Sequence, residues 1–323
     1  MTKKSQKEHE ELMHYTNECG LHGIVASKTL WASHTAFAND AEEVVGFFHR
    51  VLPVILRPEF KKYIKASKAF AARVKAADHL GIDLFEDLLA KIVNKFEEAQ
   101  RRAQDFYVFS TCTTEDPWIS QNGLLSQWRG YGAGGGYAVV FDYKRLKSLL
   151  SVERKMYHEE GWAWGDVQYT LTDLSRTKDV VMRDHIREIK RAVYKYWSTS
   201  SIKDVYPAFE SITVLSTMTK HKGFEEEKEV RMVISEPSVE IGADPRKATG
   251  KPYRKTHAYL RNGVSVPCIH LFEDQKLNAL PIQRVIVGPH PEKLLRKRAV
   301  EILLRSHGIN AAVLVSDTPF RGK

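Results

Sequence analysis

Gly136-Tyr137-Ala138-Val139-Val140-Phe141-Asp142 is the clearest secondary-structure signal in the chain. Aromatic and β-branched residues dominate it and glycines precede it, so the pattern predicts a strand that follows a Gly-rich turn. Residues 106–111 and 229–234 have the same strand-like composition. Helical periodicities separate these stretches, and we therefore expect an α+β fold around a central mixed or antiparallel sheet.

Residues 41–104 have a different pattern, because apolar side chains recur there at helical spacing, as in Phe85, Leu88 and Ile92. The chain contains no internal repeat and no low-complexity tract. We interpret residues 1–323 as a single α+β domain, with residues 41–104 as a helical insert beside or over the sheet.

The composition is typical of a globular protein, with 43% hydrophobic and 28% charged residues. No apolar run approaches the roughly 20 residues that a membrane span needs. Cys19, Cys112 and Cys268 fit neither a zinc-binding spacing nor a disulfide framework. These features predict a cytoplasmic protein with no membrane contact. The net charge of +9 favours an anionic partner, such as nucleic acid, a phosphate-bearing cofactor or an acidic surface.

A first candidate binding segment, residues 126–137, reads Ser-Gln-Trp-Arg-Gly-Tyr-Gly-Ala-Gly-Gly-Gly-Tyr. Its glycines allow close backbone approach and leave N–H groups free to meet an anion. Aromatic faces are offered by Trp128, Tyr131 and Tyr137, and the guanidinium of Arg129 offers several N–H donors in a fixed plane. This combination suits a flat ligand that carries phosphate. A hairpin turn with core aromatics is the structural alternative.

A second candidate segment, residues 221–231, is rich in charge. Alternation along a strand would place Glu227, Glu229 and Arg231 on one face. Two carboxylates and a guanidinium there indicate either a solvated edge or the lining of a site.

The histidines give weaker signals. His14 and Tyr15 lie on a predicted first strand, where a single histidine is commonly a structural residue, and they gain weight only beside the two segments above. The remaining histidines, among them His257 and His270, form no H-x-x-x-H or H-E-x-x-H pattern, so we expect no metal site.

Several short motifs follow one another along the chain. They are Leu30-Trp31-Ala32-Ser33 with Phe37-Ala38-Asn39-Asp40-Ala41-Glu42, Phe109-Ser110, Trp128-x-x-Tyr131-Gly132, Gly136 to Asp142, Lys220-x-x-x-Phe224-x-x-Glu227-x-Glu229-x-Arg231, and Val287-Gly288-Pro289. In content and order they resemble the family catalogued as domain of unknown function 2971 (DUF2971). Phe224 stands where that family has tryptophan, and Ala38 lengthens one spacing by a residue.

His14-Tyr15-Thr16, the aromatic middle strand and the late Glu-x-Glu are also similar to ADP-ribosyltransferases of the His–Tyr–Glu type. That resemblance implies an ADP-ribosyltransferase-like sheet with NAD as substrate. His14 and Tyr15 would then contact the adenosine ribose side of NAD.

The same resemblance assigns roles to the other candidates. Tyr137 or Tyr131 would stack on the nicotinamide, with Trp128 as a further aromatic face. Arg129 and Arg231 would neutralise the pyrophosphate. Glu227 or Glu229 would be catalytic, because a carboxylate stabilises the positive charge that develops on the ribose when nicotinamide leaves.

The acceptor implied by the charge is nucleic acid or a nucleic-acid-associated protein, as a toxin or antiphage effector would modify. One alternative is a non-catalytic nucleic-acid- or nucleotide-binding module that uses basic residues at 183–195 and 246–261. A further alternative is a metal-dependent nuclease built from Asp40, Glu42, Glu227 and Glu229.

Overall fold

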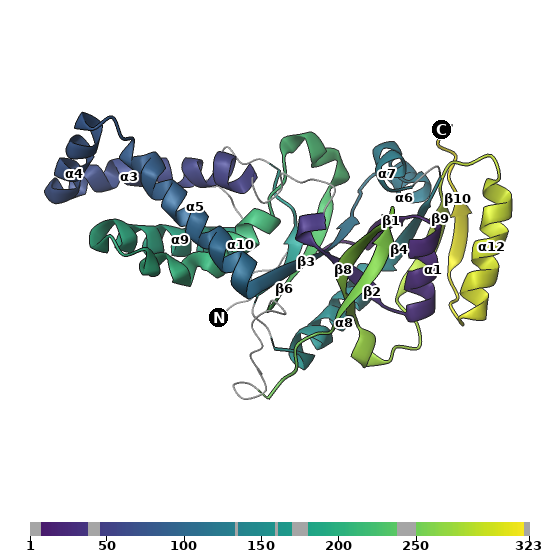
Figure 1. Ribbon diagram of the computed structural model, residues 1–323. Coiled ribbons are helices and arrows are strands. Elements are labelled where there is room, and N and C mark those ends of the chain that lie inside the picture. Colours follow the sequence, from purple (N-terminus) through teal and green to yellow (C-terminus); the bar gives the residue numbers. More distant parts are fainter. Residues whose placement is uncertain are drawn as a thin grey trace.

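The computed structural model describes residues 8–37, 46–132, 135–158, 161–169, 180–237 and 250–319. It contains a sheet with helices on both faces and a group of helices that extends from one side of it (Figure 1). The α+β fold predicted from the sequence is therefore confirmed.

The strands are β1 (Glu11–Thr16), β2 (Leu30–His34), β3 (Gln104–Cys112), β4 (Tyr137–Asp142), β5 (Gly161–Asp166), β6 (Glu229–Pro237), β7 (Thr256–Arg261), β8 (Val264–Leu271), β9 (Ile282–Val287) and β10 (Ala312–Val315). The main helices are α1 (Glu18–Ser27), α3 (Leu52–Ala66), α4 (Lys68–His79), α5 (Leu84–Ala103), α6 (Pro117–Asn122), α7 (Leu125–Tyr131), α8 (Tyr143–Met156), α9 (Val180–Thr199), α10 (Phe209–Thr217) and α12 (Lys293–Ser306). Shorter helices include the π-helix η2 (Phe47–Val51) and the 3-10 helices η4 (Ile202–Ala208), η5 (Lys222–Glu227) and η7 (Glu273–Gln275).

The described strands form one mixed sheet in the order β10-β9-β4-β1-β3-β2-β8-β7, with β6 paired to β3 and β5 paired to β6. Only the β9–β10 pair among them is parallel. Strand β3 pairs with three strands. One of its edges pairs with β6 along its whole length, and the other edge pairs with β2 over one part and with β1 over another. Tyr107 and Val108 pair with β2, whereas Cys112 pairs with β1. His14 reaches into the notch between those two pairings, where its Nδ1 lies 2.9 Å from the carbonyl oxygen of Ser110.

The two faces of the sheet are covered by different helices. Tyr137, Val139 and Phe141 of β4 join the core formed with α1, α8 and α12. Ala138 and Val140, which alternate with them, pack on the opposite face under α6 and α7. Strand β4 is therefore buried on both sides, as its unbroken apolar run leads one to expect.

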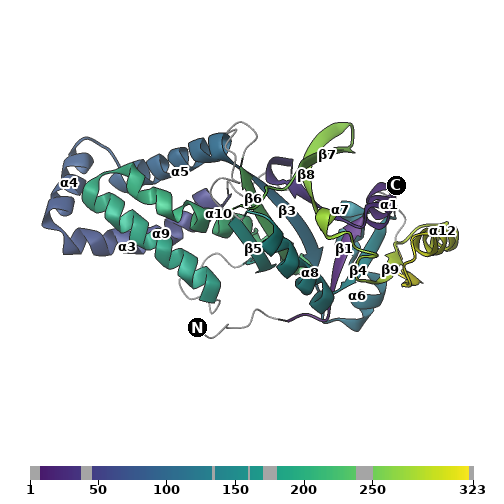
Figure 2. The ribbon, with the colours of Figure 1, turned by 90° about the horizontal axis from the view of Figure 1, so that it is seen from below.

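The helical insert predicted at residues 41–104 corresponds to η2, α3, α4 and α5, although residues 41–45 lie outside the described part. These helices pack with α9 and α10 into a second hydrophobic core, which touches the sheet at Val233. Both ribbon views show this helical group beside the sheet rather than stacked over it (Figures 1 and 2).

The Gly-rich turn between α7 and β4 is held by close backbone contact with the end of β9. Gly136 has a φ of 50°, and its carbonyl oxygen accepts a hydrogen bond from the N–H of Gly288 at 3.0 Å. A Cβ atom on Gly288 would overlap the carbonyl group of Gly135. Gly136 and Gly288 are therefore explained by chain packing. The turn follows the helix α7 and is not the hairpin turn of the structural alternative.

Replacing Gly288 by alanine should lower the free energy of unfolding by about 2 kcal/mol or more, because backbone has to move to admit the methyl group. Urea unfolding followed by circular dichroism measures this. Gly130→Ala is the matched control, since no atom lies within 4 Å of a Cβ at Gly130. Equal stabilities for the two variants would contradict the packing role of Gly288.

Candidate functional site

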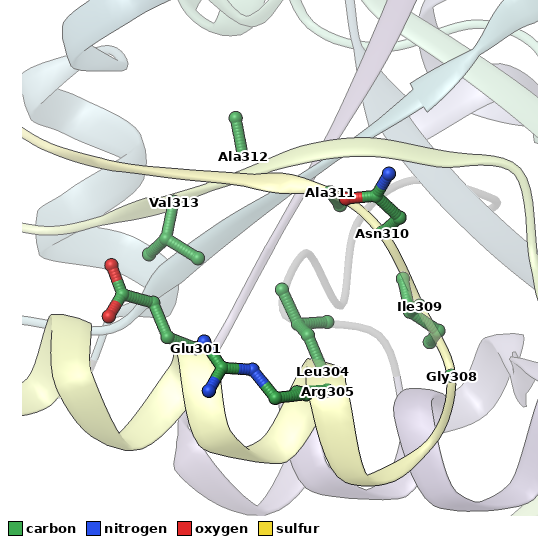
Figure 3. A pocket seen from close by; sticks show the side chains of 9 residues that line it. All are labelled: Glu301, Leu304, Arg305, Gly308, Ile309, Asn310, Ala311, Ala312 and Val313. Atoms are coloured by element: carbon green, nitrogen blue, oxygen red, sulfur yellow. The ribbon is translucent and has the colours of Figure 1, made fainter.

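The surface pocket beside the last strand does not coincide with the residues predicted to bind a ligand. It has a volume of about 450 Å³ and lies between α12 and β10 (Figure 3). Glu301 and Arg305 are its charged lining residues, and the rest of the lining is mostly small or apolar. The predicted site residues lie elsewhere, and Glu227, Glu229 and Arg231 are grouped around the start of β6.

The structure separates His14 and Tyr137 from the predicted carboxylates. Strand alternation and the core packing place both side chains on the face covered by α1, α8 and α12. His14 stacks on Phe109 with ring centroids 4.7 Å apart, and Tyr137 is fully buried and donates its hydroxyl proton to Glu18. Glu229 and Arg231 of β6 alternate with Val230 of the same core and so point to the opposite face. Period-two alternation is the physical reason why the expected single pocket is not assembled.

Tyr15 and Trp128 are on the same face as the carboxylates, but their surroundings are those of core residues. Trp128 is completely buried and donates its indole N–H to the carbonyl oxygen of Asn122 at 3.0 Å. Tyr15 meets Trp128 edge to face at 4.9 Å and accepts a hydrogen bond from the N–H of Leu124 at 2.9 Å. Neither ring is open to a ligand, so both hold α6 and α7 against the sheet.

Four charged side chains form a continuous buried chain of ion pairs, which we call the charge chain: Glu227, Lys220, Glu229 and Arg231. Lys220 Nζ lies 2.7 Å from Glu227 Oε2 and 3.3 Å from Glu229 Oε2. Arg231 donates from Nε to Glu229 Oε1 at 2.8 Å and from its second terminal nitrogen to Oε2 at 3.0 Å. The two positive and two negative groups balance, which is the condition for keeping them away from water.

The backbone places these groups in a way that the sequence interpretation missed. Glu227 is the last residue of η5 and does not belong to the strand. Lys228 follows with a left-handed φ of 42°, and β6 begins at Glu229. Strand alternation therefore does not relate Glu227 to Glu229. The turn at Lys228 brings the two carboxylates to the same lysine instead. Arg231 also donates to the carbonyl oxygen of Thr217, at 2.6 Å, at the end of α10.

The charge chain occupies the gap between two hydrophobic clusters on the same face of the sheet. Cys112, opposite Glu229 in the β3–β6 register, packs against the cluster under α6 and α7. Val233, two residues beyond Arg231, belongs to the cluster of the helical group. The charge chain therefore lies at the boundary between the part of the sheet covered by α6 and α7 and the part covered by the helical group.

Burial and neighbouring charges set the protonation of this region. Burial alone would raise the pKa of Glu229, but the charges of Arg231 and Lys220, with hydrogen bonds from Arg231 and Ser110, lower it to about 2. Burial and the negative charges of Glu229 and Glu227 raise the pKa of Cys112 well above its usual value, so its thiol stays neutral. Burial and Glu227 likewise raise the pKa of Tyr131 to about 12.

The charge chain approaches the surface at Glu227. Phe224 and Tyr131 are both partly exposed, and Lys220 Nζ lies 4.6 Å from the centre of the Phe224 ring. Arg129, two residues before Tyr131 on α7, is exposed. A carboxylate with a lysine partner thus lies next to aromatic rings, a combination that can hold the sugar and ring of a nucleotide-like ligand.

Three further residues of this region were given no role from the sequence. Lys220 was present in the quoted motif and joins the two carboxylates. Ser110, in the Phe109-Ser110 motif, lies opposite Arg231 in the β3–β6 register. Its carbonyl oxygen contacts His14 and its side chain hydrogen-bonds Glu229, so it links the two residues. Tyr169 accepts a hydrogen bond from the N–H of Glu229 at 2.7 Å, and no spacing in the sequence points to it.

The basic stretch at residues 183–195, on α9, is largely neutralised by acidic partners. Its ion pairs are Arg187 with Asp184, Lys190 with Glu59, Arg191 with Glu188, and Lys195 with Asp204. In the other stretch the structure describes residues from 250 onward, and Arg254 is buried between Glu153 and Glu236. Asp40 and Glu42, which the nuclease alternative needs, lie outside the described residues.

A family model described as "Protein of unknown function (DUF2971)" matches residues 127–232, less than half of the chain. The matched segment includes the Gly-rich turn and the whole charge chain, and it supports the family resemblance of the motifs it contains. No curated protein and no solved structure matches the chain. Among the described residues, no helix has both the length and the apolar character required to cross a membrane.

Glu229 should contribute about 3 kcal/mol to the free energy of unfolding at pH 7, because its pKa falls from an ordinary 4.5 to about 2 on folding. A lowered folded-state pKa gives stability that is present above about pH 4.5 and is lost as the pH falls toward 2. Urea unfolding across that range should show the stability gap between wild type and Glu229→Gln shrinking. A gap that stays constant with pH, or a gap no larger than that of the exposed Glu226→Gln, would contradict this assignment.

Proposed function

We propose that the chain is an NAD-dependent ADP-ribosyltransferase whose catalytic carboxylate is Glu227. The observation that carries the proposal is the difference between the two carboxylates of the charge chain. Both oxygens of Glu229 are engaged by Arg231 and Lys220, and the residue is only 3% exposed. Glu227 has Lys220 as its ion-pair partner and lies nearer the surface.

The chemistry of ADP-ribosyl transfer fits a carboxylate held in this way. Departure of nicotinamide leaves positive charge on the ribose, and a fixed carboxylate stabilises that charge as it forms. A carboxylate can also accept a hydrogen bond from the 2′-hydroxyl that strengthens in the transition state, as in glycosidases. In this proposal Glu227 carries out both tasks, while Lys220 and Glu229 keep its position fixed.

The roles of the other residues change from those implied by the resemblance to ADP-ribosyltransferases. Tyr131 and Phe224, which are partly exposed beside Glu227, are the rings proposed to contact the nicotinamide and ribose. Arg129 is proposed to meet the pyrophosphate. Tyr137, Trp128 and Tyr15 are buried core residues, and His14 points to the opposite face of the sheet from the carboxylates, so these four residues are not part of the proposed NAD contact.

The proposed acceptor is nucleic acid or a nucleic-acid-associated protein, supported by the net charge of +9. A toxin or antiphage effector would have such an acceptor. The competing candidate, a non-catalytic nucleotide-binding module, would use the same aromatic and charged residues without breaking a bond. Turnover of NAD distinguishes the two candidates.

Incubation of the full chain with ³²P-labelled NAD and a cell lysate should transfer label to a macromolecular fraction. Nuclease or protease digestion then identifies the acceptor class. Glu227→Gln should reduce labelling about a hundredfold or more, because a preorganised charge in the transition state is lost.

Glu226→Gln is the matched control, since Glu226 is an exposed carboxylate on the same 3-10 helix. It should retain wild-type labelling. Equal labelling by Glu227→Gln and Glu226→Gln would remove Glu227 from the mechanism. Absence of labelling and of any NAD-induced thermal shift, with salt-sensitive binding to nucleic acid, would favour the binding module.

A further inference from the structure

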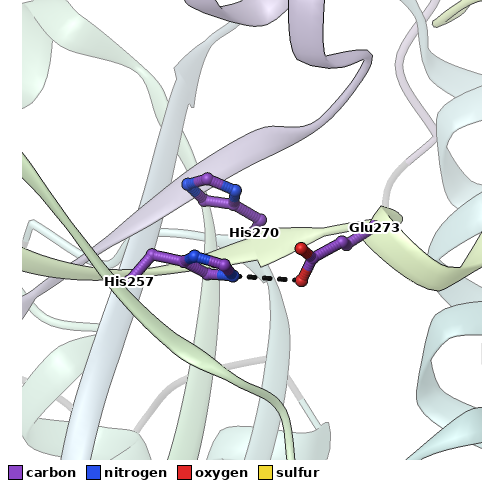
Figure 4. A group of neighbouring side chains, drawn as sticks. All are labelled: His257, His270 and Glu273. Atoms are coloured by element: carbon purple, nitrogen blue, oxygen red, sulfur yellow. Dashed lines mark hydrogen bonds and ion pairs between the residues drawn. The ribbon is translucent and has the colours of Figure 1, made fainter.

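A second cluster of functional side chains lies on the β7–β8 hairpin, apart from the charge chain. His257, His270 and Glu273 each offer one donor atom, and these atoms all lie within 4.8 Å of one another (Figure 4). The three residues come from β7, β8 and η7. Their spacing in the sequence matches no metal-binding motif, so the cluster exists only because of the fold.

The hairpin register explains why the two histidines meet. His257 is paired with Cys268, so both side chains point to the same face of the hairpin. His270, two residues after Cys268, points to that face as well and lies diagonal to His257. Phe272 then adopts a left-handed φ of 72°, which turns the chain into η7 and returns Glu273 toward the histidines. Glu273 Oε2 lies 3.0 Å from His257 Nε2.

Aromatic packing fixes one of the two imidazoles more firmly than the other. His270 is stacked on Trp31, with centroids 5.1 Å apart and planes 8° from parallel. His257 is stacked on the other side of His270, at 4.0 Å and 9°. Its side chain is 30% exposed and that of Glu273 is 33% exposed, so this side of the cluster is accessible to an ion.

We propose that His257, His270 and Glu273 bind one divalent transition-metal ion. Two imidazoles and one carboxylate are a ligand set used for zinc and for other first-row metals, and they leave a coordination position open for water or an anion. The nearly parallel rings direct their nitrogens side by side, so binding has to rotate the His257 ring out of the stack. His270 remains on Trp31, and Glu273 follows from its present contact with His257.

The proposed site is independent of ADP-ribosyl transfer. It does not share a residue with the charge chain, and bound metal would join β7, β8 and η7 at one end of the sheet. Imidazole donors distinguish it from sites for Mg²⁺ or Ca²⁺, which prefer oxygen ligands. Zn²⁺ alone is therefore the appropriate probe and Mg²⁺ the appropriate negative ion.

Titration calorimetry of the chelator-treated full chain with Zn²⁺ tests the proposal. One equivalent should bind, and His257→Gln and Glu273→Gln should each weaken binding by more than the roughly 10- to 100-fold that loss of an outer-shell partner causes. His22→Gln is the control. His22 lies one turn from Cys19 on α1, and because both side chains are exposed, they stand for weak binding of zinc at the protein surface. This variant should bind like wild type.

A spectroscopic measurement reports on metal ligation directly while leaving the stack of His270 on Trp31 in place. Co²⁺ should give visible absorption bands of a low-coordinate site in wild type. Excess Mg²⁺ should leave these bands unchanged, and the His257→Gln variant should not show them. Circular dichroism of the metal-free variants confirms their folding. Zinc binding that is unchanged in His257→Gln, that fails to reach one equivalent, or that is lost equally in His22→Gln would overturn the proposal.

Discussion

The buried ion pairing of Glu229 with Arg231 and Lys220 is the interaction on which the arrangement of this protein most depends. These side chains are almost completely removed from water. Taking one partner away leaves an uncompensated charge in a buried position, which commonly costs 3–5 kcal/mol. The charge chain is therefore a strong constraint on the relative positions of the segments that supply its members.

Those segments are distant in sequence and belong to different layers. Arg231 connects β6 to the last turn of α10 through Thr217, and Lys220 lies three residues after that helix ends. Ser110 of β3 adds a hydrogen bond to Glu229 and also supplies the carbonyl oxygen beside His14. The helical group, the centre of the sheet and the notch between β1 and β2 are thus connected by one polar network. Its outer member, Glu227, is the group to which we assign chemistry.

Much of the fold can be predicted from composition and periodicity. The strand after Gly136 and the helices within residues 41–104 follow from local patterns, because burial on two faces and helical amphipathicity leave clear signatures. The site was only partly predictable. The composition of residues 221–231 indicates an unusual segment, but alternation alone predicts that Glu227 belongs to a strand. A lysine gives no sign of the left-handed turn at position 228 that ends η5 after Glu227. The sequence alone does not separate His14 and Tyr137 from the carboxylates, because the face of a sheet that a residue occupies depends on the strand register.

The same limit explains the histidine cluster. His257 and His270 are thirteen positions apart, and only the hairpin register of β7 and β8 makes them neighbours. Trp128 shows the opposite error, since an aromatic residue beside glycines and an arginine resembles a ligand-binding residue although the structure uses it to anchor α7. In each case the residue type indicates what chemistry a side chain could perform. Its contacts in the fold come from residues distant in the sequence, which the local pattern does not identify.

The most direct test of this account is a double-mutant cycle between Lys220→Met and Glu229→Gln, measured as the free energy of unfolding in urea. If the charge chain is the constraint described here, the double variant should be more stable than the sum of the single effects predicts, with a coupling of about 1–3 kcal/mol. Additive effects, with a coupling near zero, would show that Lys220 and Glu229 act independently and would contradict the account.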